Sequence, residues 1–318
     1  MRRLSLLTCA AALGACLIAP ASQAAQRSHA DTHARTQRAA LVHFQRDLVS
    51  VLAPRADAQP LLGAALLART LRNQPRPLDF HHLITRAAAG GGGAAVNWTQ
   101  LADCDAKAQT CPNADALAKL KQQAPDNAAV WLLALGQDEH NLDYKAAQAD
   151  LEQAAQAARY DDYAGASMQA AALAVATLPP PAATQDAHGP LASSPSGVQA
   201  MIVFGVASTQ PLPGFQAAAQ LCAANKDHAE IRAQCLQLGK TLEWGSSALA
   251  RSLGLHLRET LSTDSAAQAD AKKARRDLIW QVQNFTRLTA LAQTDPAVAQ
   301  RLLRLARHGG TEMSVMLA

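Results

Sequence analysis

The residues able to do chemistry in this chain are few, and their spacing fits no metal site. His81 and His82 are adjacent. On a helix, neighbouring side chains diverge by about 100°, so these two cannot bind one ion without further ligands. The chain contains neither a His-Glu-x-x-His zinc motif nor a Gly-x-Ser-x-Gly nucleophile motif. The sequence therefore predicts no catalytic residue, no metal and no cofactor.

Four further groups could in principle take part in catalysis. The glycine run 90–93 lacks the Lys-Ser/Thr that follows a phosphate-binding loop, which favours a flexible joint. The Gly-Ser-Ser at 245–247 is more typical of a helix end followed by a cap than of a nucleophile turn. The pairs 161–162 (Asp-Asp) and 139–140 (Glu-His) could transfer protons, but exposed turn residues of these types are usually inert. None of the four identifies a reaction.

The N-terminus has the features of a secretory signal peptide. Arg2 and Arg3 precede an apolar run over 4–19, and Ser-Gln-Ala at 22–24 offers small residues at both positions that determine cleavage. We therefore expect residues 1–25 to be removed and the mature chain to be periplasmic or secreted.

Two alternatives at the N-terminus differ in their relation to the membrane. A retained membrane helix needs roughly 20 apolar residues, and this shorter run is followed by Pro20, so we expect no membrane span after cleavage. Residues 13–16, Leu-Gly-Ala-Cys, resemble a bacterial lipobox, in which Cys16 would carry a lipid anchor. The apolar run continues through Leu17 and Ile18, which favours the soluble product, with the lipoprotein as the alternative.

The cysteines that remain after cleavage predict disulfides. Two of the six lie in the signal peptide, and the other four are Cys104, Cys111, Cys222 and Cys235. An even number in an exported chain favours disulfides, and no Cys-x-x-Cys spacing supports the zinc alternative. Of the three ways to pair them, local closure favours Cys104–Cys111 and Cys222–Cys235.

Charge and composition narrow the class of protein. The chain holds 29 Lys and Arg against 25 Asp and Glu, and loss of Arg2 and Arg3 leaves 27 against 25. This near balance argues against nucleic acid as the partner. Hydrophobic residues make up 49% but aromatic residues only 4%, with much alanine, the residue with the best helix propensity. Because alternating β-branched runs are scarce, an all-α protein is expected.

One signature occurs twice in the chain. Residues 94–101 are AAVNWTQL and residues 128–135 are AAVWLLAL, so Ala-Ala-Val recurs after 34 residues. Recurrence at this period is typical of stacked helix-turn-helix units.

The second unit, 128–161, resembles a tetratricopeptide repeat. It keeps an aromatic residue in the first helix, an Asp-Tyr turn and a stripe of small and bulky residues, at Trp131, Asp143, Tyr144, Ala147, Leu151 and Ala154. Pro125, Asp126 and Asn127 stand where the family has its inter-repeat proline, with Asp126 or Asn127 able to cap the next helix. The resemblance implies stacked antiparallel helical hairpins with a concave binding surface. It also implies that Trp131, Leu135, Leu151 and Ala154 lie in the core between helices, and that Gln137 and Asp138 contact a partner.

The resemblance weakens toward the N-terminus. Residues 94–127 keep the signature and Leu117, 34 positions before Leu151, but Trp98 is shifted by one position and the cysteine segment replaces the tight turn. Residues 60–93 fit less well, with Leu83 again 34 positions earlier. Helical repeats of this kind cover about a third of the chain, and alanine-rich hairpins can resemble them by composition alone.

The remaining segments predict further helices. Residues 32–53 form an amphipathic helix that we expect to cap the repeats, which gives a helical-repeat region over 26–178. Residues 179–196, rich in proline, serine and alanine, form a linker or a long surface loop. Residues 197–318 then form a second helical bundle, with a hairpin over 215–244 that Cys222–Cys235 would staple.

These observations favour a non-catalytic exported protein that binds a peptide or protein partner in the cell envelope. The alternative is an exported enzyme that acts on an envelope polymer through carboxylates the sequence does not identify.

Overall fold

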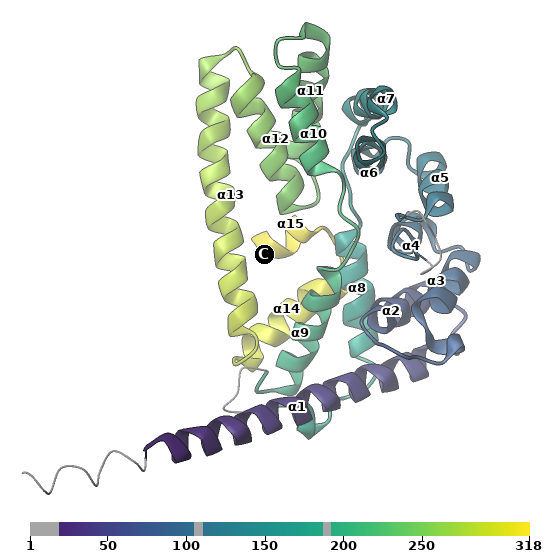
Figure 1. Cartoon of the computed structure of the whole chain (residues 1–318), viewed down its shortest axis with the longest axis vertical. Coiled ribbons are helices and arrows are strands. Elements are labelled where there is room, and N and C mark those ends of the chain that lie inside the picture. Colours follow the sequence, from purple (N-terminus) through teal and green to yellow (C-terminus); the bar gives the residue numbers. More distant parts are fainter. Residues whose placement is uncertain (1–18, 105–110, 187–191) are drawn as a thin grey trace, which may run out of the picture.

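The computed structural model describes residues 19–104, 111–186 and 192–318, and side chains from residue 32 onward. Within these ranges the chain is all-α, with helices packed on one another and no named strand (Figure 1). The predicted fold class is confirmed. Among the described residues, no helix combines the length and apolar character that crossing a membrane requires.

Six helices form three successive hairpins along one side of the molecule (Figure 1). The pairs are α2 (Ala58–Arg69) with α3 (Phe80–Ala89), α4 (Gly93–Gln100) with α5 (Ala114–Gln123), and α6 (Ala128–His140) with α7 (Tyr144–Gln156). The short 3₁₀ helix η1 (Arg76–Leu78) precedes α3. Leu83, Leu117 and Leu151, spaced by 34 residues, are all buried in the second helix of their hairpins. The hairpins therefore stack in a solenoid-like manner.

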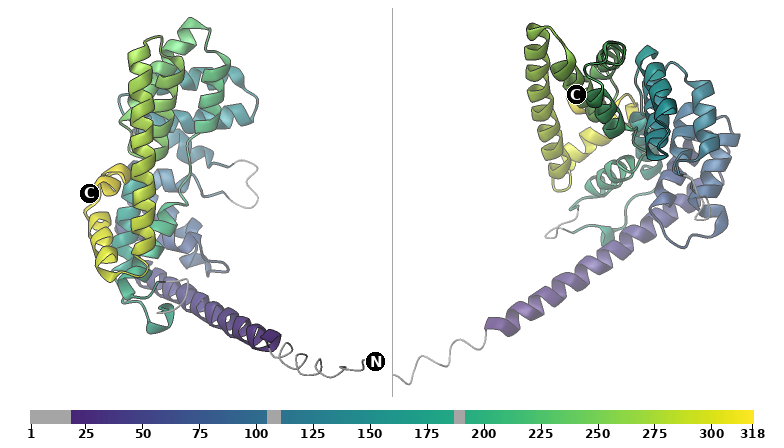
Figure 2. Two further views of the ribbon diagram at one scale, coloured as in Figure 1. Left: turned by 90° about the vertical axis from the view of Figure 1, so that its left-hand side faces the viewer. Right: turned by 45° about the horizontal axis from the view of Figure 1, so that its top comes forward.

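Helix α1 (Ala19–Leu52) crosses one end of the molecule and projects beyond it (Figure 2). Phe44, Leu48 and Leu52 are buried, as the amphipathic pattern predicts. The helix begins inside the predicted signal peptide, of which residues 1–18 lie outside the described part of the chain. Cleavage near Ala24 or Ala25, and a lipid anchor at Cys16, therefore stay predictions.

Eight helices follow from the described second half of the chain. They are α8 (Ala164–Val175), α9 (Pro195–Ala207), α10 (Phe215–Ala224), α11 (Ala229–Glu243), α12 (Ala248–Leu261), α13 (Ser265–Leu291), α14 (Pro296–His308) and α15 (Glu312–Leu317). Among them, α8, α9, α10 and α11 contact the hairpins directly. Aspartate side chains cap several of the helices: the Asp295 carboxylate, for example, accepts hydrogen bonds from the amides of Ala297 and Val298 at the start of α14.

Two large hydrophobic cores hold the molecule together, and both combine helices from either side of segment 179–196. One core joins α1, α2, α3 and α8 to α9 and α14. The other joins α4 to α7 with α10, α11 and α12. The described part of the segment, which includes η2 (Ala182–Thr184), lies against α1: the Gln37 side chain donates to the Thr184 carbonyl at 3.1 Å. The described part of the segment therefore packs on α1, and the predicted domain boundaries stay a prediction.

Both predicted disulfides are present. Cys104 bonds to Cys111 with 5.5 Å between their Cα atoms, and Cys222 bonds to Cys235 with 5.9 Å. The second bridge staples α10 to α11, as the polar turn between the two cysteines predicts. Residues 105–110, which the first bridge encloses, lie outside the described residues.

The prediction for the hairpin of α6 and α7 is right for three of its four core residues. Leu135, Leu151 and Ala154 are fully buried. Trp131 is only half-buried, and its indole N–H donates to the Pro125 carbonyl at 2.8 Å. Its placement in the core between helices is therefore wrong. Trp131 follows Val130, which is buried, and a step of one residue turns a side chain by about 100° around the helix.

Candidate functional site

The predicted partner-binding residues Gln137 and Asp138 lie near the end of α6, among the repeats. The Gln137 side chain points toward the preceding hairpin, where it approaches the Pro112 carbonyl at 3.4 Å. Asp138 lies beside Asp150 of α7. Both residues are half-buried, Gln137 facing the preceding hairpin and Asp138 facing α7 of its own hairpin, and partner binding through them stays a prediction.

Asp150 links two hairpins through a buried ion pair. Lys121 of α5 donates to its carboxylate at 3.2 Å. Burial raises the pKa of Asp150 to about 6, with Asp138 adding to the increase and Lys121 opposing it. This arrangement joins one hairpin to the next.

The faces that α4 and α6 turn toward the interior are covered by the chain itself. The Gly214 amide donates to the Leu132 carbonyl of α6 at 3.0 Å, and Thr99 of α4 donates to the Gln210 side chain at 3.2 Å. Gly136 and Gly214 approach so closely that a Cβ on either would clash with the other's backbone. The loop containing residues 208–214 therefore occupies part of the surface that a ligand of the repeats would otherwise use.

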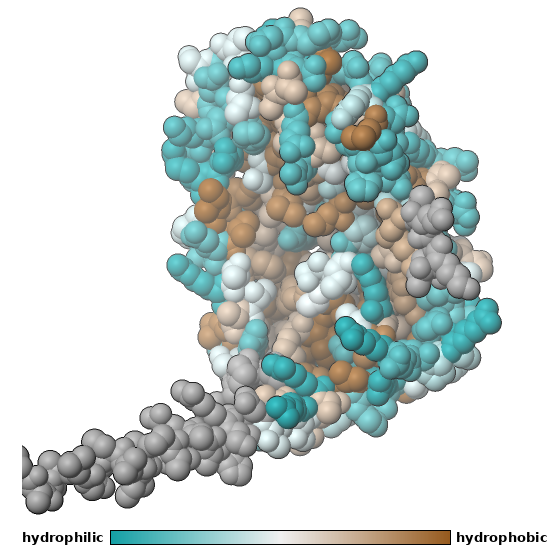
Figure 3. Space-filling model, viewed as in Figure 1, coloured by the Kyte–Doolittle hydropathy of each residue, from teal (hydrophilic) through white to brown (hydrophobic). Residues whose placement is uncertain are grey.

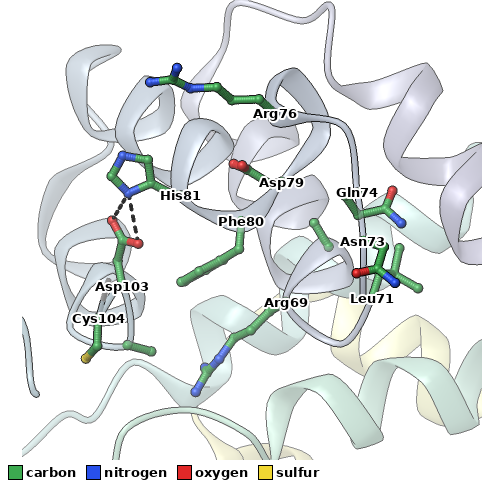
Figure 4. A pocket seen from close by; sticks show the side chains of 12 residues that line it. Arg69, Leu71, Asn73, Gln74, Arg76, Asp79, Phe80, His81, Asp103 and Cys104 are labelled. Carbon is green, nitrogen blue, oxygen red and sulfur yellow. Dashed lines mark hydrogen bonds and ion pairs between the residues drawn. The ribbon is translucent and has the colours of Figure 1, made fainter. Parts of the chain in front are cut away.

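A polar cavity of about 600 Å³ opens near the end of α2 and the start of α3 (Figure 4). His81 forms a hydrogen-bonded pair with Asp103, whose carboxylate lies 2.9 Å from Nδ1. The Arg69 guanidinium stacks on the Phe80 ring at 5.8 Å, and burial lowers the pKa of Arg69. The described lining of this cavity holds no hydroxyl or free thiol, so the His81–Asp103 pair has no side-chain nucleophile to activate there.

The predicted absence of a metal centre is not contradicted by this cavity or by the rest of the described chain. Within those residues, no three His, Cys, Asp or Glu side chains gather closely enough to hold an ion. His81 faces Asp103, and the neighbouring His82 donates its backbone amide to the Asp79 cap at 2.7 Å.

A second cavity, of about 410 Å³, lies where α8 meets helices that follow segment 179–196; we call it the junction pocket. Helices α8, α9, α12 and α13, the start of α15 and residues 208–212 contribute to it. Most of its walls are apolar, supplied by Met168, Phe204, Leu212, Leu249 and Phe285. Figure 3 shows apolar side chains gathered across the middle of the molecular face, at the level of α15.

A network of polar groups closes one side of the junction pocket around Asp162. Its carboxylate accepts hydrogen bonds from the Tyr160 hydroxyl at 3.1 Å, from the Ser246 hydroxyl at 3.2 Å and from the Ala164 amide at 3.3 Å. Burial, together with the charge of Asp162, raises the pKa of Tyr160 well above its ordinary value, so the phenol stays protonated as a donor.

Glu312, the first residue of α15, brings a second carboxylate to the same pocket. It accepts a hydrogen bond from the Ala248 amide at the start of α12, at 3.3 Å. Burial raises the pKa of Glu312, and the negative charge of Asp162 raises it further. A cavity with apolar walls, a few convergent polar groups and one acid of perturbed pKa, Glu312, has the features of a ligand site.

The sequence does not predict the junction pocket, although two segments at it, 161–162 and 246–247, contain residue types that could do chemistry. The Asp-Asp at 161–162 and the Ser-Ser at 246–247 were each expected to be local turn or cap residues, and they do border helices. Asp162 and Ser246 are 84 residues apart in the sequence, and only the tertiary structure brings them into hydrogen-bonding contact. The buried Asp162 had one local signal, the strongly apolar helix that follows it, but nothing in the sequence indicated its partners.

Comparison with known proteins does not assign the chain to a family. No family model matches the chain, and no curated protein or solved structure shows significant similarity to it.

Proposed function

We propose that this protein is an exported, non-catalytic helical-repeat protein that binds a peptide or protein partner in the cell envelope, with the junction pocket as the binding site. The observation that carries the proposal is the apolar character of the pocket and of its edge. Leu212 and Leu249 line it with 63% and 55% of their surfaces exposed. Exposed apolar side chains that adjoin an apolar cavity are typical of interaction sites.

The tetratricopeptide-like character of the repeats is part of this proposal. Its support is the burial of equivalent positions 34 residues apart and the contact between successive inter-repeat turns. The Asn127 side chain caps α6 through the Ala129 amide and also donates to the Asp161 carbonyl, 34 residues further along, at 2.7 Å. Repeats connected in this way form rigid frames for partner binding in many proteins.

Export is supported by the cysteines. Two intramolecular disulfides suit an oxidising compartment such as the periplasm or the extracellular space. N-terminal sequencing of the protein from the cells that make it should find a chain beginning at or just after Ala24 or Ala25. A chain that retains Met1 would contradict export, whereas a lipidated Cys16 would favour the anchored form.

An enzyme acting on an envelope polymer is the second candidate, because the junction pocket contains two carboxylates. Asp162 accepts three hydrogen bonds from the protein, which favours a structural role for it over proton transfer. Release of soluble fragments from purified envelope polymer by the wild-type chain, abolished by Glu312→Gln, would favour the enzyme.

Peptide selection tests the binding function directly. A random peptide library is panned on the oxidised mature chain, and the enriched peptides are titrated against Leu249→Asn. We expect this variant to bind at least about tenfold more weakly, because it replaces an apolar contact at the edge of the pocket. Val51→Asn, at an exposed position of α1, is the matched control and should bind normally. Equal binding by Leu249→Asn would contradict the assignment of the pocket.

A further inference from the structure

The charges of the junction pocket are unbalanced. Asp162 and Glu312 are the only ionisable residues in its described lining. Neither forms an ion pair with a Lys, Arg or His of the described chain, whose ion pairs lie elsewhere. The pocket therefore places two acids beside apolar walls, where Coulomb interactions are stronger than in bulk water.

Helix N-termini compensate these acids only in part. Asp162 accepts from the first amide of α8 and Glu312 from the first amide of α12, so each carboxylate faces the positive end of a helix dipole. Asp162 has two further donors, Tyr160 and Ser246. For Glu312 the Ala248 amide is the single donor among the described residues, so one of its carboxylate oxygens is left for a ligand.

Two nearly buried polar side chains provide an independent indication of a ligand. Gln210 and Ser247 line the pocket and are only 8% and 3% exposed. The Gln210 Nε2 makes no hydrogen bond to any described residue, and the Ser247 Oγ interacts with the Tyr160 hydroxyl without a hydrogen bond of good geometry. Buried polar atoms are nearly always satisfied in native proteins, so unpartnered ones beside a cavity point to groups that a ligand would supply. The Gln210 amide nitrogen is a donor and calls for an acceptor such as a peptide carbonyl.

We propose that the junction pocket binds a peptide segment that carries a basic side chain flanked by apolar residues. This inference rests on the proposed function and names the ligand class of the same site. The ammonium or guanidinium group pairs with Glu312, the flanking apolar side chains lie against Met168, Phe204 and Phe285, and a backbone carbonyl accepts from Gln210. The contacts with Glu312 and Gln210 satisfy groups that the unliganded pocket leaves without an ion-pair or hydrogen-bond partner.

Two peptide pools test the proposal by fluorescence anisotropy. Both are acetylated, amidated and labelled, with randomised flanks; one carries Leu-Lys-Leu at its centre and the other Leu-norleucine-Leu. Norleucine keeps the aliphatic chain of lysine and removes the charge. We expect the oxidised mature chain to bind the lysine pool roughly tenfold or more tightly than the norleucine pool, as is typical when a charged group loses its partner.

Glu312→Gln should abolish this preference, because glutamine keeps an acceptor for the Ala248 amide but removes the charge. Glu230→Gln, at an exposed position of α11, should retain it. Thermal unfolding of both variants checks that they are folded. A lysine preference that persists in folded Glu312→Gln would overturn the assignment of Glu312.

The remaining outcomes separate this inference from the proposed function. Tight binding of both pools without preference overturns the requirement for a basic side chain and leaves peptide binding intact. Failure of both pools to bind overturns both proposals. Hexylammonium chloride tests whether a small amine suffices as the ligand. If it displaces the labelled peptide at the same concentration as the unlabelled peptide does, the pocket binds a free amine and the proposed peptide ligand is wrong.

Discussion

The two copies of the Ala-Ala-Val signature have different surroundings, although both stretches begin with Ala-Ala-Val and end five residues later in Leu. In the first unit, residues 94–127, Trp98 is fully buried and its ring lies 5.7 Å from that of Tyr163. In the second unit, residues 128–161, Trp131 is half-buried and the Lys121 ammonium lies 4.9 Å from the centre of its ring. One tryptophan belongs to the core and the other to the surface between two hairpins.

The difference shows that position within the repeat decides the role of a residue. Counting 34 residues from Trp98 leads to Leu132, which is also fully buried. Counting back from Trp131 leads to Asn97, whose side chain donates to Gln123 of α5 at 2.7 Å. Asn97 and Trp131 thus occupy equivalent positions of the two units, and each contacts α5 or the segment that follows it. A shift of one residue along a helix moves a side chain from one neighbour to another.

The turns of the two units also differ. The second unit has a tight turn ending at Asp143, whose carboxylate caps α7 through the Ala146 amide at 3.0 Å. The first unit replaces this turn with a longer connection closed by Cys104–Cys111. Both units cap their second helix, since the Asn113 side chain accepts from the Ala116 amide at 3.0 Å, and the first unit adds a covalent bridge.

The largest expected effect is that of Trp98→Ala. Truncation of a fully buried tryptophan should lower the free energy of unfolding by about 3–5 kcal/mol, from lost burial and from the cavity left behind. Urea denaturation monitored by circular dichroism measures this change. A loss under about 1 kcal/mol would mean that Trp98 is not in the core, and that the two tryptophans are equivalent after all.

Removal of the bridge in the first unit should have a smaller effect. The paired substitution Cys104→Ser and Cys111→Ser should cost about 2 kcal/mol, because the loop that the bridge closes is short. The Cys222–Cys235 bridge closes a longer loop, between α10 and α11. The paired substitution Cys222→Ser and Cys235→Ser should therefore lower the free energy of unfolding by about 3 kcal/mol on the same chain-entropy estimate. Non-reducing peptide mapping of the wild type should find both local bridges and no free thiol; a peptide linking Cys104 to Cys222 would contradict the pairing.

Trp131→Ala sharpens the comparison because the same side chain is lost from a half-buried site. We expect it to lower the free energy of unfolding by about 1–2 kcal/mol, from the partial burial of the ring and the contact with Lys121. The same urea titration as for Trp98→Ala provides the measurement. A cost equal to that of Trp98→Ala would restore the original expectation of a core residue.

The smallest effect concerns the pH dependence of the contact between the two units. The pKa of Asp150 is raised to about 6, above its ordinary value of about 3.9 in an unfolded chain, so the folded state binds the proton more tightly. Stability should therefore fall as the pH rises from about 4 to about 6. Asp150→Asn should flatten this slope, because asparagine does not ionise.

Thermal unfolding at a series of pH values measures this slope. Asp115→Asn, an exposed position on α5, is the matched control and should leave the slope as it is in the wild type. A wild-type slope that persists in Asp150→Asn would show that another group is responsible.

Much of the local structure could be predicted from the sequence by itself. Asn127, Asp295 and Thr311 cap the helices that they precede, and the cysteine pairs close as their spacing predicts. Such features depend on residues a few positions apart, so the chain determines them wherever the segment lies in the fold. The 34-residue repeat is determined in the same way, since each hairpin contacts its neighbours in the sequence.

The junction pocket was decided only by the tertiary structure. The spacing of Leu249, Leu253 and Leu257 predicts one buried helix face, and Leu253 and Leu257 are buried, but Leu249 is exposed at the edge of the pocket. Asp162 meets Ser246 across 84 residues, and Glu312 meets Ala248 across 64. Close approach between distant helices depends on small residues such as Gly136 and Gly214, and in an alanine-rich chain many pairings satisfy that requirement equally. Sequence therefore determined which segments are helices and how they begin, whereas packing among similar small-residue faces decided which of them enclose the site.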